Sequence, residues 1–254
     1  MREAILLPGN TNVGKTLTLV SLAWLKPESQ VVIFDPENKV RIVLEELGMK
    51  PEDLPNLTLV PVTPKWNEFA DTYKELRENL TENDWVCFDM MSRFWDLAQN
   101  YFSREVFGLS PAEHIIALRR ASKRADFEGF DGLTDWTVIK RMHNEDIMDD
   151  AVLWRPFNVC ATTSLTSYSP REKLPKTGVE GLMVQEFPES PKIEGEKHNK
   201  FRFDSIAVLY QRLDTGAYCF KVVKHKGKPA IPPLQEYDIT GRLFWSGYKD
   251  FLGG

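Results

Sequence analysis

The chain has 254 residues and a formal net charge of −5 at pH 7, a length that one α/β domain with elaborated loops can reach. The acidic balance excludes a surface that attracts nucleic acid as a whole, so any such binding needs a local basic patch or a channel between subunits. The three cysteines lie far apart in apolar runs, which fits neither a zinc site nor a disulfide framework, and no apolar run reaches the roughly 18 residues of a membrane span. We therefore expect a cytoplasmic protein.

The first third of the chain alternates short apolar runs with helical patterns. Four runs of apolar and β-branched residues, each bounded by turn residues, predict buried strands. They are Ala4–Leu7, Gln30–Phe34, Leu57–Val62 and Trp85–Phe88. Helical spacing of apolar residues fills the intervals between them. The first predicted helix begins at Lys15-Thr16 and continues to Leu25. Two more predicted helices cover Val40–Leu47 and Trp66–Leu80.

The middle of the chain, from Arg93 to Trp154, is aromatic-rich and mostly helical in pattern, with a loop expected around Glu128–Thr134. Asn158–Thr162 is a further buried strand. The stretch from Ser164 to about Lys200 holds four prolines, several glycines and many charges, but little periodicity. We therefore predict a long functional or mobile loop over about residues 164–203.

Strand character returns near the C-terminus. Ser205–Tyr210 and Tyr218–Val223 flank an Asp-Thr-Gly turn, which predicts a hairpin, and an extension of about residues 229–254 follows it. Strands alternating with helices predict one α/β domain over residues 1–254, with a mostly parallel sheet, helices on both faces and an antiparallel hairpin at the C-terminal edge. Ligands in such folds bind at the carboxyl ends of the strands, so the residues that follow each strand are the candidates for function.

A glycine-rich motif joins the first predicted strand to the first predicted helix, and it fits the pattern G-x-x-x-x-G-K-[ST]. Its residues are Gly9, Asn10, Thr11, Asn12, Val13, Gly14, Lys15 and Thr16. The glycines let the backbone wrap round phosphate, whose charge is met by amide N–H groups and the helix N-terminus. In such a P-loop Lys15 reaches the β- and γ-phosphates of ATP and the Thr16 hydroxyl ligates Mg²⁺.

Acidic residues follow two of the predicted strands. Asp89 comes directly after Phe88, where an acid can hold Mg²⁺ opposite Thr16 as a Walker B aspartate does, although an acid there can also be a turn or cap residue. Asp35 and Glu37 follow the second strand, where hydrolysis needs a group that positions the attacking water. We favour Glu37 for this role, with Asp35 as the runner-up and a solvated turn pair as the alternative.

Two further groups of polar residues follow late strands. Thr162, Thr163 and Ser164, at the end of the strand Asn158–Thr162, could sense the γ-phosphate or merely satisfy backbone groups at the strand end. Lys224 and Lys226 end the hairpin. They could form a soluble sheet edge, or they could supply a cation in trans to the nucleotide of a neighbouring subunit.

The order of these features resembles the RecA-like ATPase core. In archaeal and eukaryotic recombinases the second strand ends in a similar Asp-x-Glu whose glutamate is catalytic, and Glu37 matches it. In KaiC- and DnaB-like relatives a Lys-x-Arg-Gly string supplies finger residues in trans, and Lys224-His225-Lys226-Gly227 is similar, with lysine in place of arginine. The compact size and the string Pro191–Gly195 look most like small phage-encoded RecA-core ATPases of the single-strand annealing and recombination type.

The resemblance implies a Mg²⁺-dependent ATPase of phage-type recombination or replication that assembles into a ring or short filament in the host cytoplasm. It implies ATP hydrolysis between subunits, single-stranded DNA as partner in a channel lined by the loops after Asp89 and Ser164, and a single-strand binding protein or replication partner. The basic cluster Arg119, Arg120, Lys123 and Arg124 is a candidate for DNA contact, although we favour a solvated helix face for it. The aromatic residues Tyr168 and Phe187 are candidates for stacking on bases. The alternatives are a P-loop small-molecule or nucleotide kinase, with Arg171 as a lid residue, and a nucleotide-gated loader or packaging adaptor with little turnover.

Overall fold

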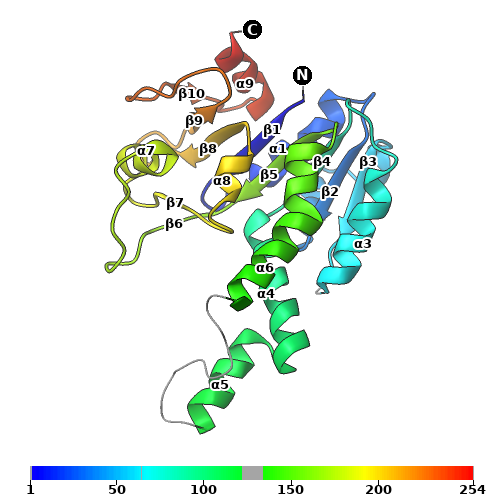
Figure 1. Cartoon of the computed structure of the whole chain (residues 1–254). Coiled ribbons are helices and arrows are strands. Elements are labelled where there is room, and N and C mark those ends of the chain that lie inside the picture. The colour runs from blue at the N-terminus through cyan, green and yellow to red at the C-terminus, as the bar shows by residue number, and fades with distance from the viewer. Residues whose placement is uncertain (1, 64, 122–133, 254) are drawn as a thin grey trace.

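An eight-stranded sheet in the order β10-β9-β8-β1-β5-β4-β2-β3 forms the centre of the computed structural model, which describes residues 2–63, 65–121 and 134–253 (Figure 1). The strands of this sheet are β1 (Ala4–Pro8), β2 (Val31–Asp35), β3 (Leu57–Pro61), β4 (Trp85–Phe88), β5 (Asn158–Thr163), β8 (Ser205–Gln211), β9 (Tyr218–His225) and β10 (Glu236–Asp238). The run from β3 to β8 is parallel, whereas β9 and β10 are antiparallel to their neighbours.

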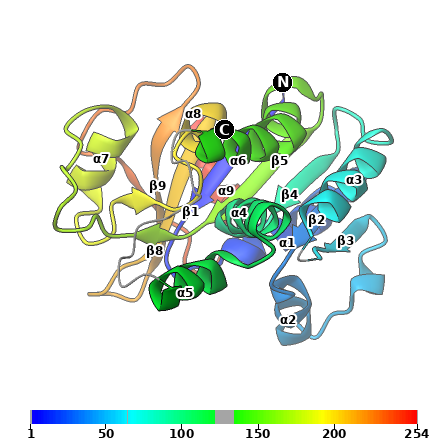
Figure 2. The ribbon, with the colours of Figure 1, turned by 60° about the horizontal axis from the view of Figure 1, so that its bottom comes forward.

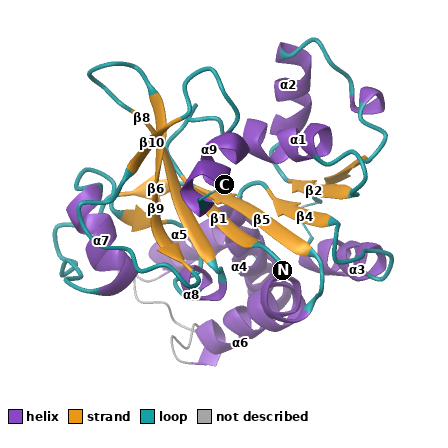
Figure 3. Cartoon of the chain, turned by 90° about the horizontal axis from the view of Figure 1, so that it is seen from above, coloured by secondary structure: helices purple, strands orange, loops and turns teal. Residues whose placement is uncertain are grey.

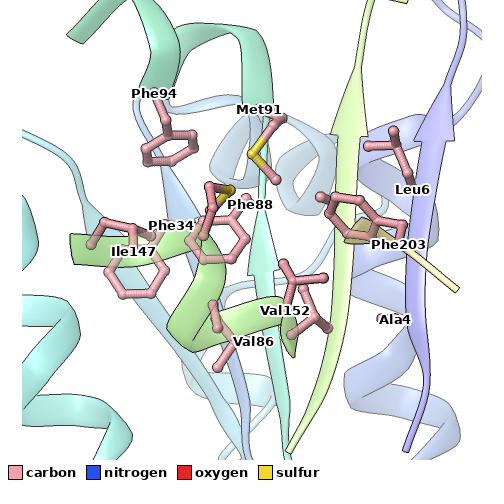
Figure 4. Close-up of a cluster of buried hydrophobic side chains, with 14 of the residues drawn as sticks. Ala4, Leu6, Phe34, Val86, Phe88, Met91, Phe94, Ile147, Val152 and Phe203 are labelled. Carbon is pink, nitrogen blue, oxygen red and sulfur yellow. The ribbon is translucent and has the colours of Figure 1, made fainter. Parts of the chain in front are cut away.

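Helices cover both faces of the sheet (Figure 3). They are α1 (Lys15–Leu25), α2 (Lys39–Glu46), α3 (Trp66–Arg77), α4 (Met91–Phe107), α5 (Pro111–Ala121), α6 (Thr134–His143), α7 (Gly178–Glu186), α8 (Asn199–Arg202) and α9 (Phe244–Leu252), with the π-helical segment η2 (Asn144–Trp154) and the 3-10 turn η1 (Pro51–Asp53). Side chains alternate along each strand, so Ile5 and Leu7 of β1 pack on the side of α1, α2 and α9. Ala4 and Leu6 pack on the side of α3, α4 and η2, where Figure 4 shows Phe34, Phe88 and Phe94 in the same cluster.

The helices α4, α5 and α6 extend past the sheet at the end where the parallel strands finish. In Figure 1 α5 lies farthest from the sheet, and in Figure 2 this end is turned toward the viewer. Because α4 begins at Met91, directly after β4, its first turn lies at the same sheet edge as the P-loop. The loop predicted around Glu128–Thr134 lies outside the described residues, apart from Thr134, where α6 begins.

The predicted fold class is confirmed. The five predicted parallel strands are present, and the hairpin of β8 and β9 pairs antiparallel. The features that were missed are the three-residue strand β10, the helix α9, the 3-10 turn η1 and the regular structure within the predicted long loop over residues 164–203. That segment contains α7, α8 and a small two-stranded sheet of β6 (Leu165–Thr166) and β7 (Lys192–Ile193). The elements α8, β6 and β7 are too short to produce a clear period in the sequence, and α7 has no strong apolar face.

None of the helices in the described part of the chain is both long and apolar enough to cross a membrane.

Candidate nucleotide site

The P-loop connects β1 to α1, as the motif predicted, and its backbone has little room for side chains. A Cβ at Gly9 would lie 2.6 Å from the Leu209 carbonyl oxygen and 2.8 Å from Cγ2 of Val13, so only glycine fits there. Gly14 has φ +83°, in the left-handed region that favours glycine, directly before α1. The loop therefore exposes backbone N–H groups at a helix N-terminus, which is the arrangement that binds phosphate.

Lys15 is buried at the start of α1 and contacts the loop itself. Its Nζ donates hydrogen bonds to the carbonyl oxygens of Gly9 (2.7 Å) and Asn10 (2.5 Å). Burial lowers the pKa of Lys15 to about 8, against the opposing effect of the nearby Asp89 carboxylate. A phosphate group would supply the counter-charge that this buried ammonium lacks.

Asp89 and Thr16 lie together as predicted. The Thr16 hydroxyl donates to one carboxylate oxygen of Asp89 at 2.7 Å, and the Thr162 hydroxyl donates to the other. Thr162 reaches Asp89 because β5 lies between β1 and β4 in the sheet. Burial raises the pKa of Asp89, while the two hydroxyl hydrogen bonds act in the opposite direction.

This set of oxygen donors fits a nucleotide-bound Mg²⁺, which uses one or two protein ligands and completes its shell with phosphate and water. Among the described residues, no group of three or more His, Cys, Asp or Glu side chains could hold a metal ion without such help. Thr16 and Asp89 are therefore the residues that would hold the ion. Thr162 was predicted among the hydroxyls that could sense the γ-phosphate, but its contact with Asp89 was not predicted.

The two acids after β2 have different surroundings. Asp35 is buried, and its carboxylate accepts hydrogen bonds from the backbone N–H groups of Glu37 (3.1 Å) and Val40 (2.8 Å), which fixes the entry into α2. Glu37 instead forms ion pairs through its side chain with Lys39 and Arg93. Burial acts to raise the pKa of Glu37, but hydrogen bonds from Lys39 and Arg93 hold it below its usual value. Asp35 thus has a structural role, and Glu37 is the better candidate for positioning water.

Thr163 and Ser164 lie at the end of β5, next to the P-loop, whose Gly9 N–H donates to the Thr163 carbonyl at 3.1 Å. The Thr163 hydroxyl donates to the backbone carbonyl of Glu194 at 3.0 Å, so it joins β5 to the chain after β7. Ser164 lines a hollow of about 470 Å³, here named the β5–α4 hollow, together with Ser92, Arg93, Trp95 and Lys192. Of the two residues, Ser164 lines this hollow and Thr163 does not.

Lys224 and Lys226 lie at the opposite end of the sheet from the P-loop. Lys224 pairs in register with Ile206 near the start of β8, and β8 runs parallel to β1. Its Nζ donates to three backbone carbonyls at the end of α8, at 3.2, 3.1 and 2.5 Å. Lys226 is exposed, with its Nζ 3.7 Å from the Asp204 carboxylate. Neither lysine can therefore reach the nucleotide site of its own chain.

The described residues expected to contact DNA belong to three parts of the chain: α5, the segment between β6 and α7, and the residue that follows α7. Arg119 and Arg120 belong to α5, and Arg120 is exposed, whereas Lys123 and Arg124 lie outside the described residues. The Tyr168 ring has the Nζ of Lys192 5.4 Å from its centroid. Phe187 packs edge-on against Tyr210 at 5.4 Å, which makes it part of the protein packing.

Comparison with known proteins finds similarity among solved structures. No family model and no curated protein matches this sequence. Among solved structures, the chain is similar to the crystal structure of the RadB recombinase, with a TM-score of 0.46 and 16% sequence identity over 94% of this chain and 88% of that chain. This similarity assigns no activity to the chain.

Proposed function

We propose that this protein is a single-domain, RecA-like, Mg²⁺-dependent ATPase that acts on single-stranded DNA in phage-type recombination or replication, with ATP hydrolysed between subunits. The observation that carries the proposal is the meeting of the P-loop, the Thr16–Asp89 pair and Glu37 at one edge of the sheet. A P-loop alone is typical of ATP binding. A carboxylate after the end of β2, the strand next to β4 and its Asp89, adds the group that hydrolysis needs.

Each residue of the site has a separate role in this mechanism. The P-loop amides and the Lys15 ammonium bind the phosphates, and Thr16 and Asp89 hold the ion. Bound Mg²⁺ neutralises charge on the β- and γ-phosphates. Glu37 orients the attacking water. To do so, one of its carboxylate oxygens has to be released from its ion pair with Lys39 or Arg93. Lys226, which is exposed at the far end of the sheet, is the better placed of the two hairpin lysines to reach the site of a neighbouring subunit.

The β5–α4 hollow supports a role in binding a nucleic-acid strand. It lies between the segments that follow Asp89 and Ser164, and its lining combines the cations Arg93 and Lys192 with the aromatic ring of Trp95. Cations for the backbone and an aromatic ring for a base are the groups that single-strand binding uses.

Steady-state phosphate release with Mg-ATP, with and without an oligodeoxythymidine strand, tests this proposal. For Glu37→Gln we expect a loss of about 100-fold or more in turnover, whereas Glu46→Gln, which removes an exposed carboxylate from α2, should leave turnover unchanged. Turnover that DNA stimulates and that Glu37→Gln abolishes would support the proposal. Turnover that is slow, indifferent to DNA and unchanged in Glu37→Gln would contradict it.

A nucleotide-gated adaptor with little turnover is the second candidate, and one observation favours it. Both Glu37 oxygens face cations, Lys39 and Arg93, which leaves neither free for water in this conformation. Tight ATP binding with negligible phosphate release under every condition would favour the adaptor. Transfer of phosphate to a small molecule would instead indicate a kinase.

A further inference from the structure

Glu37 and Arg93 form an ion pair between two elements that are far apart in sequence. Glu37 follows β2, while Arg93 lies in the first turn of α4, four residues after Asp89. The Arg93 Nε donates to Glu37 Oε1, and the Arg93 Nη1 lies 3.6 Å from Asp96 on the same helix. The Glu37 side chain is 18% exposed and the Arg93 side chain 53% exposed, so the arginine is the partner that can move into solvent.

Arg93 also lines two hollows on either side of the start of α4. One is the β5–α4 hollow described above. The other, of about 540 Å³, lies between the ends of β2 and β3 and the side of α4, and includes Pro36, Val62 and Asn100. A ligand in the first hollow would therefore meet a guanidinium group whose other contact is the carboxylate proposed to position water.

A guanidinium binds carboxylate and phosphate with the same planar geometry, so the two anions compete for it. In the β5–α4 hollow a phosphate group would also find the Lys192 ammonium and the hydroxyls of Ser92 and Ser164, and it would face the carboxylates of Asp96 and Glu194 in the same lining. Lys192 is held by Glu172 at 2.7 Å and is 39% exposed, which leaves it accessible. The hollow thus offers an anion several donors, of which Arg93 is the one joined to Glu37.

We propose that Arg93 is a positioning residue that holds Glu37 away from the orientation in which it can position water. A phosphate group of single-stranded DNA that enters the β5–α4 hollow binds Arg93, breaks its ion pair with Glu37 and so frees Glu37. This inference rests on the proposed function, because it assumes that Glu37 positions water. It adds the means by which DNA binding and hydrolysis are coupled: one arginine shared between the two sites.

The charged groups around Glu37 determine how its pKa changes when Arg93 is removed. Lys39, at the start of α2, and Arg93 contact it directly, and Lys15 at the start of α1 lies within electrostatic range. Asp35 accepts a hydrogen bond from the backbone N–H of Glu37, so its contact is with the Glu37 backbone. Removing Arg93 leaves Lys39 as the one remaining direct cation among these, so the pKa of Glu37 should rise toward its ordinary value.

Arg93→Gln tests the inference, with Arg104→Gln, which removes an exposed cation from the last turn of the same helix, as the matched control. Without DNA, we expect Arg93→Gln to turn over ATP about three- to fivefold faster than wild type, since a half-exposed ion pair contributes a modest restraint. The stimulation by oligodeoxythymidine should fall to near unity. The acid limb of turnover against pH should move to higher pH. Arg93→Lys, which keeps the charge, should fall between the two proteins in each respect.

A titration of Glu37 followed by NMR tests the same inference without measuring ATP turnover. In nucleotide-free protein the ¹³C carboxyl resonance of Glu37, identified by its absence in Glu37→Gln, should titrate at higher pH in Arg93→Gln than in wild type. Oligodeoxythymidine should produce the same shift in wild type, and none in Arg93→Gln.

Two results would overturn the inference while leaving the proposed function standing. One is loss of turnover in both Arg93→Gln and Glu37→Gln, which would make Arg93 a supporting cation. The other is a Glu37 titration that neither Arg93→Gln nor oligodeoxythymidine changes. Turnover that Glu37→Gln does not reduce would instead defeat the proposed function, whatever Arg93→Gln does.

Discussion

Replacing Lys15 by methionine should stabilise the nucleotide-free protein while abolishing its response to ATP. The fall in the pKa of Lys15 from 10.5 to about 8 corresponds to about 3 kcal/mol of unfavourable burial of the charge near pH 7. The hydrogen bonds that Lys15 donates to the Gly9 and Asn10 carbonyls offset about half of this. We therefore expect Lys15→Met to be about 1–2 kcal/mol more stable near pH 7, with a Tm about 3–6 °C higher.

The lowered pKa of Lys15 also predicts how the stability of the wild-type protein changes with pH. Between pH 8 and 10.5 the unfolded chain binds the Lys15 proton more tightly than the folded chain does, so the stability of wild type rises with pH across this window. The gap between Lys15→Met and wild type should accordingly close as the pH is raised from 7 to 10. Thermal unfolding over this range measures it, with Lys26→Met, which removes an exposed ammonium at the end of α1, as control.

Saturating Mg-ATP should reverse the order of stability. A ligand that binds only the folded state stabilises it in proportion to the logarithm of its concentration over Kd, and wild type should gain this while Lys15→Met does not. A variant that is less stable than wild type at every pH would refute the reasoning. A stability gap that does not change between pH 7 and 10 would refute it equally.

Two further predictions concern the rest of the chain. Asn56→Ala should lower the free energy of unfolding by about 2–3 kcal/mol in urea denaturation, because the buried amide donates to three backbone carbonyls at and after the end of α1, while Asn79→Ala, at an exposed position, should change little. Lys226→Ala should reduce turnover at protein concentrations that allow assembly and leave the Tm unchanged, whereas Lys224→Ala should lower the Tm, because it removes the donor for the carbonyls after α8. A Lys226→Ala protein with full turnover in the assembled state would exclude the trans role.

Much of the fold was predictable because its signals are local. The strands β1, β2, β4 and β5 are short and buried on both faces, so each appears in the sequence as a continuous apolar run. The segment over residues 164–203 was harder, because α7 carries two glycines and has no strong apolar face. Its structure depends on contacts such as the hydrogen bond from the Thr163 hydroxyl to the carbonyl of Glu194, which join residues that are distant in sequence.

Some residues of the candidate site were likewise predictable from the sequence, and others were not. The P-loop was predictable from spacing alone, since its glycines are required by the turn itself and by the close approach to Leu209. Asp89 was predictable because it ends a strand. Glu37 was favoured over Asp35 from the sequence, but the contacts that distinguish the two acids were not predictable, because the acids are two residues apart and the folded chain brings different neighbours to them.

The sequence by itself determined the phosphate-binding loop, the alternation of buried strands and helices, and the positions of the acids at strand ends, because each is set by the chemistry of residues within a few positions of one another. Only the tertiary structure decided which polar groups meet. It brought Thr162 to Asp89 by placing β5 between β1 and β4, and it joined Arg93 of α4 to Glu37 beyond β2. It also carried Lys224 to the end of the sheet away from the P-loop, because the direction of β9 follows from antiparallel pairing with β8.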